Sequence, residues 1–321
     1  MRLLLFNDPH FSFQSPISRN EHYAKDILRK LSEVIILASK TSSDYLICSG
    51  DIFHRKSSTS FYESNIIMKL FKRSRVPIYG IAGSHDMNGY EFSSVYRKAA
   101  GSLFTAECIK PLDVYPIESE GILVTGTSYH RMYDISRSAY CKPEQYIDKY
   151  VISITHGSLI LSDSGTFFGN YTNMNDLRNL KFGVLSNVIF NGHMHAPQKQ
   201  YKFNDKDCTV FNVGSLARNI YKEDVAKRKP CVMLMDIKEG SFKSELIELK
   251  NVKDFKEAFI ARDIKTLEDD SSIKDFVNAL INESGELSST SEKDLIYKVI
   301  TQYGYDEAIH SRVLSYIESE E

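Results

Sequence analysis

The sequence has few cysteines, and none of them are paired at metal-binding spacing. Its 321 residues contain five, namely Cys48, Cys108, Cys141, Cys208 and Cys231. The number is odd, the positions are scattered and no Cys-x-x-Cys pair occurs, which argues against a disulfide framework and against a thiolate zinc site. We therefore expect buried free thiols.

Long apolar segments are also absent. No stretch approaches the roughly 18–20 apolar residues that a membrane span requires. The apolar run Leu3–Phe6 near the start is too short for the core of a signal peptide. We expect a cytoplasmic protein with no membrane partner.

A large net charge is missing as well. The chain has 40 Lys plus Arg against 42 Asp plus Glu, a formal charge of -2, so no global polycation indicates nucleic-acid binding. The balance hides two opposite parts: residues 251–321 contain 8 basic and 16 acidic residues, which leaves 32 and 26 for residues 1–250. The basic excess in the first part is either an ordinary solvated face or a surface that positions a phosphate backbone. It includes Lys72, Arg73, Arg75, Lys199, Lys202, Lys206, Arg218, Lys222 and Lys227–Lys229.

The remaining composition is that of an ordinary globular protein, with 42% hydrophobic and 26% charged residues. A length above 300 residues favours one large unit with a smaller attachment, or two domains, over one small module. We place the boundary near residue 250, with one domain at 1–250 and a C-terminal region at 251–321.

Strand and helix patterns alternate in the first hundred residues. Apolar runs at Leu3–Asn7, Tyr45–Cys48 and Pro77–Ala82 predict strands, and helical spacing predicts helices over 23–38 and 61–71. This alternation indicates an α/β fold with a parallel or mixed sheet.

Shorter apolar runs follow after about residue 100, and they predict further strands. They lie at Gly121–Thr125, Val151–Thr155, Val188–Phe190, Val210–Val213 and Cys231–Met235. The segment Ser162–Asn175, rich in Gly, Asn, Ser and Thr, predicts a long loop. Beyond residue 250, amphipathic spacing predicts helices over 273–281, 291–303 and 309–317.

Side chains that bind metals well follow the predicted strands at the point where each one ends. They are Asp8 and His10, Asp51, His85 and Asp86, His156, and His193 with His195. In open α/β sheets, ligands gather at the carboxyl ends of strands, so these groups can converge on one site. A carboxylate can bridge two ions, and imidazoles suit Mn²⁺, Fe²⁺ and Zn²⁺. The pattern therefore predicts a dinuclear site, in which two ions would generate a hydroxide near neutral pH and clamp a phosphoryl group.

Each short motif is common by itself, but their order is specific. Asp-Pro-His, Gly-Asp-Ile-Phe-His, Gly-Ser-His-Asp, Thr-His-Gly and Gly-His-Met-His occur in this order, each at a predicted strand end. This series resembles the calcineurin-like metallophosphoesterase superfamily over about residues 1–236. The resemblance implies a two-sheet αββα sandwich, to which we add a small, mostly helical C-terminal region.

Within that superfamily the sequence is most similar to the SbcD-type nuclease subunit of the double-strand-break repair complex. The supporting segments are Ser15–Arg19, Gly50–His54 followed by Ser57 and Ser58, and Asn212–Arg218 with Lys229 and Pro230 ahead of a strand. The sequence leaves open whether the chain is bacterial or from a bacteriophage.

The resemblance implies specific roles for the site residues. Asp8, His10 and His195 would hold one ion, His156 and His193 the other, and Asp51 would bridge them. His85 would protonate the leaving oxygen, with Asp86 orienting its imidazole. His54 would lie near the substrate or pack at the rim. The ions would be two Mn²⁺, with Mg²⁺, Fe²⁺ or Zn²⁺ as alternatives.

The sequence departs from the family pattern at Ser84, where an Asn amide usually completes the second metal shell. Serine is a shorter and poorer ligand, so either a water fills the gap or the second ion binds weakly. The second case predicts an activity that demands high Mn²⁺.

The resemblance also implies function and partners. The expected activity is that of a manganese-dependent DNA nuclease, a 3′–5′ exonuclease and single-strand endonuclease in DNA repair and recombination. It would form a homodimer and act with an SMC-like ATPase of SbcC type. The C-terminal helices would cap the site and dock on that ATPase, or simply pack on the catalytic domain. Alternatives are a phosphoesterase for small phosphodiesters or phosphoproteins, and a scaffold with a degenerate metal site.

Overall fold

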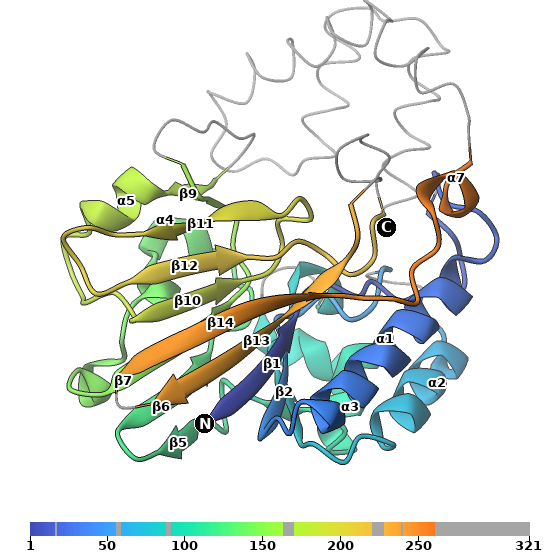
Figure 1. Cartoon of the computed structure of the whole chain (residues 1–321), viewed down its shortest axis with the longest axis horizontal. Helices are drawn as coiled ribbons and strands as arrows, with labels where there is room; N and C mark the ends of the chain where they lie inside the picture. The colour runs from blue at the N-terminus through green and yellow to red at the C-terminus, as the bar shows by residue number, and fades with distance from the viewer. Residues whose placement is uncertain are drawn as a thin grey trace, which may run out of the picture. The chain divides into compact units, whose positions relative to one another are not determined.

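The structure is a computed structural model, and it describes residues 1–16, 18–55, 59–87, 91–162, 170–219, 228–238 and 240–260. These residues form two six-stranded mixed sheets with helices on their outer faces (Figure 1). The predicted two-sheet αββα sandwich is thereby confirmed. The predicted helices over 273–281, 291–303 and 309–317 lie outside the described residues.

The first sheet is built around four parallel strands from the N-terminal part of the chain. Its strand order is β14-β13-β1-β2-β3-β4, and the pairs β1–β2, β2–β3 and β3–β4 are all parallel. Because these strands run the same way, their carboxyl ends meet at one edge. The strands are β1 (Arg2–Phe6), β2 (Tyr45–Cys48), β3 (Ile78–Gly80), β4 (Lys110–Pro111), β13 (Cys231–Lys238) and β14 (Ser241–Glu248).

The second sheet has the order β11-β12-β10-β7-β6-β5; its four central strands β12, β10, β7 and β6 are parallel to one another, and the two edge strands are antiparallel to them. The carboxyl ends of these four strands also lie together. The strands are β5 (Ile117–Ser119), β6 (Ile122–Gly126), β7 (Tyr150–Thr155), β10 (Val188–Asn191), β11 (Gln198–Lys202) and β12 (Thr209–Asn212). A small third sheet pairs β8 (Leu159–Ile160) with β9 (Thr172–Asn173).

Three helices cover the outer face of the first sheet, as Figure 1 shows: α1 (Tyr23–Lys40), α2 (Phe61–Phe71) and α3 (Ala99–Thr105). Short helices and 3-10 turns lie in the connections of both sheets, and a final helix follows β14. They are α4 (Tyr133–Ser136), α5 (Met174–Arg178), α7 (Phe255–Ala258) and the 3-10 turns η1 (Ser84–Asp86), η2 (Phe92–Arg97), η3 (Ser138–Tyr140) and η4 (Glu144–Tyr146).

Alternation along the strands explains the layers. In β1, Leu3 and Leu5 belong to the core between the two sheets, whereas Leu4 and Phe6 pack against the helices of the first sheet. A third core lies on the other side of the second sheet, where Ile189 of β10 packs. Since successive side chains point to opposite faces, a continuous apolar strand buries both of its faces here.

Several elements differ from the sequence-based expectation. The predicted loop 162–175 is wrong at its C-terminal end, where Thr172 and Asn173 form β9 and Met174 begins α5. The Asn173 side chain accepts a hydrogen bond from the Asp176 amide, and the Asp176 carboxylate accepts one from the Asn173 amide. Residues 163–169 lie outside the described part of the chain. The strands β11 and β14 went unpredicted because as edge strands they expose many polar side chains, which weakens the apolar signal.

The structure also tests the prediction for the cysteines and shows the contacts of the chain near residue 250. All five cysteines are free; Cys48, Cys108 and Cys208 are buried as predicted, whereas Cys141 and Cys231 are half-buried. The amides of Lys250 and Asn251 donate to the Glu33 carboxylate of α1. No helix within the described residues is long and apolar enough to cross a membrane.

Candidate metal centre

The strand-end residues of both sheets converge on one site. Asp51 follows β2 of the first sheet, and its carboxylate belongs to two groups of side chains whose ligand atoms lie within 4.8 Å of one another. One group adds His10, after β1, and His195, after β10; the other adds His156, after β7, and His193, after β10. The structure therefore brings together residues that are nearly the length of the domain apart in sequence.

Distances within the site show how closely these atoms converge. The Asp51 Oδ2 atom lies 3.2 Å from His156 Nε2 and 3.5 Å from His10 Nε2. The Nε2 atoms of His10 and His195 are 2.8 Å apart. Ring nitrogens and a carboxylate oxygen thus point at common centres, which is the arrangement that cation binding requires.

Asp8 provides the clearest test of whether this site fits a metal ion. It is fully buried, and neither of its carboxylate oxygens has a hydrogen-bond partner. A buried carboxylate without partners is costly, so such groups are normally paired or coordinate metals. Asp8 Oδ1 is also 3.6 Å from His156 Nδ1. Unsatisfied oxygens beside imidazole nitrogens form a donor set that fits divalent transition metals.

Backbone conformation at the site is unusual. Asp8, His10, Asp51 and His193 have φ values of 45°, 45°, 49° and 67°, in the left-handed region. For residues other than glycine this conformation costs free energy and persists only where the surroundings enforce it. Holding these four residues in this conformation therefore lowers the stability of the fold, and it directs their side chains inward.

Two glycines make the close approach of the loops possible. Gly50 has a φ of 101°, and a Cβ atom there would lie 2.7 Å from the Gly83 nitrogen. A Cβ on Gly83 would lie 2.2 Å from Asp51 Oδ1. A side chain at Gly50 would collide with Gly83, and one at Gly83 would collide with Asp51, which explains locally why glycine precedes Asp51 and Ser84.

His85 lies beside the two ligand groups, and a backbone carbonyl orients it. Its Nδ1 atom is 2.5 Å from the His54 carbonyl oxygen, so Nδ1 must carry the proton and donate. Its ring lies 4.8 Å from that of His10, centroid to centroid. His54 stacks on His85 at 5.8 Å and is half-buried, so it is in contact with the site.

Asp86 does not contact the His85 imidazole as expected, but accepts hydrogen bonds from other groups. The Asp86 carboxylate accepts hydrogen bonds from the backbone amides of Ile52, Phe53 and Gly83. This corrects the interpretation of Asp86 as the group that orients the ring. Asp86 instead ties the loop after β2 to the loop after β3, because one carboxylate satisfies three amides.

The histidines of the site differ in charge. Burial lowers the pKa of His193 to about 3 and that of His195 to about 4, so both are neutral near pH 7 and can offer lone pairs. Burial also lowers the pKa of His156, but the carboxylates of Asp51 and Asp8 outweigh it and raise the value to about 9. Without a cation, a proton on His156 balances these carboxylates; a bound metal would replace that proton.

A further layer of residues holds the ligands, and the sequence analysis missed it. The Asn7 side chain donates to the Asn191 carbonyl and accepts from the Ser49 hydroxyl. The Ser49 carbonyl lies 2.7 Å from His156 Nδ1, which fixes the ring. Asn7 and Asn191 end or follow their strands directly beside metal-competent residues, and that position is the signal that could have revealed them.

Arg218 and Arg228, which the sequence analysis counted toward a basic surface for a phosphate backbone, make other contacts in the structure. Arg218 is buried, and its guanidinium donates to the carbonyls of Arg228 and Lys253. Arg228 donates to the carbonyls of Ser215 and, at 3.1 Å, His195. These arginines therefore support the loop that holds His195, whereas Lys199, Lys202 and Lys229 are exposed.

Ser84 begins the turn η1, directly before His85, and is half-buried. The adjacent His85 amide donates to Asp51 Oδ1 at 2.7 Å. Ser84 therefore directly precedes the residue whose backbone amide contacts the Asp51 carboxylate. Whether its hydroxyl coordinates an ion stays a prediction.

Comparison with known proteins identifies the class. Residues 1–197 match the family of calcineurin-like phosphoesterases. The chain belongs to this family, whose members are metal-dependent hydrolases that use divalent ions. The Asp51-centred histidine groups are the part of the structure that could hold such ions.

The chain is also similar to the DNA double-strand break repair protein Mre11 of Archaeoglobus fulgidus, with 20% identity over 253 residues, 71% of this chain and 55% of that protein. The chain thus spans about half the length of this curated relative. Among solved structures, a 5′-nucleotidase precursor from Thermus thermophilus matches with 12% identity, a TM-score of 0.48, and coverage of 88% of this chain and 60% of that one. A hypothetical protein from the same organism matches with 12% identity, a TM-score of 0.42, and coverage of 77% and 99%.

Proposed function

We propose that the protein is a manganese-dependent DNA nuclease of SbcD type, which hydrolyses phosphodiester bonds as a 3′–5′ exonuclease and as a single-strand endonuclease. The observation that supports phosphoester hydrolysis is the pair of histidine groups that share Asp51. The weak similarity to an archaeal double-strand break repair protein favours DNA as the substrate.

The ligand assignment starts from the two groups and adds Asp8, which belongs to neither of them. Asp8, His10 and His195 would hold one Mn²⁺, His156 and His193 the other, and Asp51 both, with Mg²⁺, Fe²⁺ or Zn²⁺ as alternatives. When bound, two such ions supply an activated water and neutralise charge on the phosphate. The chain contributes two carboxylates, Asp8 and Asp51, which offset part of the charge of the cations.

His85 would exchange the proton of the reaction. Its Nδ1 proton is donated to the His54 carbonyl, so the proton that the leaving oxygen takes would be a second one, carried on Nε2 of a doubly protonated ring that also interacts with the phosphate. The bond from Nδ1 to a carbonyl also fixes the ring plane, so the proton sits at one place. His54 takes part through its carbonyl and through its stacked ring.

One experiment separates this proposal from its alternatives. Purified protein is incubated with Mn²⁺ and end-labelled DNA, beside a His85→Asn variant and with a small phosphodiester as a second substrate. DNA cleavage that the variant loses by about a hundredfold or more supports the proposal. Activity on small diesters alone would indicate a general phosphoesterase, and the absence of both activities would indicate a scaffold with a degenerate site.

The partners belong to the same proposal. Residues 1–250 would form the catalytic domain of a homodimer, and residues 251–321 would cap the site and bind an SMC-like ATPase of SbcC type in the cytoplasm during DNA repair and recombination. A chain that ends at residue 287 should fail to co-purify with the ATPase while keeping its nuclease activity. Retained binding would contradict the assignment of the last helices.

A further inference from the structure

A cavity of about 510 Å³ lies next to His85, in the range of volumes typical of small-molecule sites. Residues from the start of α2, from η2 and from α3 line it, together with His85 and Asp86. The cavity therefore adjoins the proposed metal centre on the side from which His85 would act.

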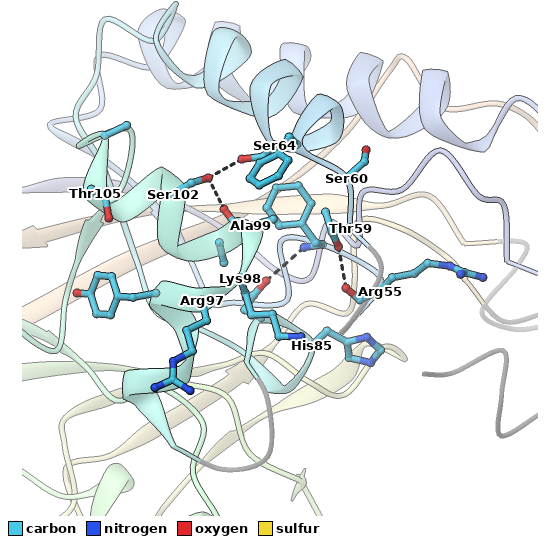
Figure 2. Close-up of a pocket in the computed structure, with 16 residues that line it drawn as sticks. Arg55, Thr59, Ser60, Ser64, His85, Arg97, Lys98, Ala99, Ser102 and Thr105 are labelled. Atoms are coloured by element: carbon cyan, nitrogen blue, oxygen red, sulfur yellow. Dashed lines mark hydrogen bonds between the residues drawn. The ribbon is translucent and has the colours of Figure 1, made fainter.

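The lining of this cavity is cationic. Arg55, Arg97 and Lys98 contribute three positive charges, and Figure 2 shows them with His85 along one edge of the pocket. Asp86 is the acidic residue among the described lining residues, and its carboxylate already accepts backbone amides. An anionic ligand is the one that such a lining attracts.

The opposite edge of the cavity is fixed by packing. The hydroxyls of Ser64 in α2 and Ser102 in α3 are 2.5 Å apart, and the Ser102 hydroxyl also lies 2.7 Å from the Ala99 carbonyl. A Cβ on Gly101 would lie 2.3 Å from the Val95 carbonyl oxygen, so only glycine lets α3 approach η2 this closely. The cations at the junction of η2 and α3 are thus presented from a rigid frame, which lowers the entropic cost of binding.

Two exposed aromatic residues are among those that line the cavity. Phe61 and Tyr96 line the cavity and are 92% and 52% exposed. Next to Phe61 in sequence, Tyr62 is 67% exposed and stacks on the exposed Phe13 at a centroid distance of 5.4 Å. Exposed rings beside a cationic groove are the combination that single-stranded nucleic acids use, because bases stack on the rings while phosphates meet the cations.

We propose that this cavity is a subsite for the nucleotide next to the scissile phosphate, with Arg97 and Lys98 on its phosphate and with Phe61 and Tyr96 placed for base stacking. The inference rests on the proposed nuclease function. It adds that the substrate is recognised as a strand, since only a substrate with a neighbouring nucleotide would contact both His85 and the cations and rings that line the rest of the cavity.

The test measures binding apart from cleavage. A fluorescent single-stranded oligonucleotide is titrated in EDTA with wild-type protein, with an Arg97→Gln/Lys98→Gln variant, and with Lys243→Gln as control. Lys243 is an exposed lysine of β14, level with the amino end of β1, and does not line the cavity. The double variant should bind about tenfold more weakly, and its salt slope should fall by about 0.7 for each lost phosphate contact.

The outcomes distinguish the subsite from the function. If the wild type cleaves and binds DNA but the double variant binds it equally well, the subsite is wrong and the nuclease function stands. If the wild type neither binds nor cleaves DNA, the proposed function fails and the subsite with it. A change in molar mass by light scattering, without a change in affinity, would assign the cavity to a contact between copies of the chain and overturn the subsite.

Discussion

The two sheets contribute chemically different halves of the metal centre. Loops of the first sheet supply the carboxylates Asp8 and Asp51 and one imidazole, His10, whereas loops of the second supply the three imidazoles His156, His193 and His195. Charge that can offset a cation thus comes from one sheet, and most of the neutral donors come from the other. Neither half is a complete site, so the packing of the sheets creates the centre.

Asp51 gives the largest expected effect, because it is the ligand that both groups share. Asp51→Asn removes the shared charge while keeping the size of the side chain. We expect the loss of both ions and a fall in hydrolysis of about a thousandfold or more. Metal content by elemental analysis after gel filtration checks this. One retained equivalent would show that Asp51 is not shared.

Substitution of a ligand from the second sheet should have a more limited effect on metal content and activity. His193→Asn removes an imidazole from one group only, the one formed with Asp51 and His156. We expect about one ion to remain, with activity reduced by about a hundredfold. Elemental analysis beside Asp51→Asn makes the comparison. If both variants bind the same amount of metal, the sheets do not divide the site in this way.

A substitution of Arg228 tests how far the metal ligands of the second sheet depend on the contacts that hold the His195 loop. Its guanidinium donates to the carbonyls of His195 and Ser215, so Arg228→Met should loosen the His195 loop. We expect the affinity for Mn²⁺ to fall by about 10- to 100-fold. Calorimetric titration measures the affinity, and Arg228→Lys should restore part of it. An unchanged Kd in Arg228→Met would contradict the role.

Ser84 gives the smallest expected change, and in the opposite direction. Ser84→Asn introduces a longer side chain with an amide oxygen next to the contact between the His85 amide and Asp51. If the second ion is weakly bound in the natural chain, the variant should bind it about tenfold more tightly. The Mn²⁺ dependence of the rate measures this. Equal affinity and rate in both proteins would show that the position does not limit metal binding.

Part of this structure could be read from the sequence. The strands β1, β2 and β10 and the helices α1 and α2 have continuous apolar runs or clear helical spacing, so their positions were predicted to within about a residue or two. The placement of Asp8, Asp51, His156 and His193 after strand ends was visible for the same reason. The end of a strand can be predicted from the local pattern of residues, and the sequence gives directly the type of each residue that follows it.

Other features depended on contacts between distant segments. No local signal shows that Arg218 and Arg228 turn inward to backbone carbonyls instead of forming a DNA-binding face. In the same way, Asp86 finds three amides and His85 finds the His54 carbonyl only after the loops of β2 and β3 are side by side. Polar edge strands such as β14 give no apolar pattern either.

The sequence by itself determined the class of fold, the set of metal-competent residues and the strand ends at which they stand, because these follow from side-chain chemistry and from short-range periodicity. The tertiary structure alone decided which of these residues share a centre, which basic residues face solvent, and where a cationic cavity opens beside His85. The physical reason is that ligand groups and buried hydrogen bonds are satisfied across both sheets, between residues far apart in the chain.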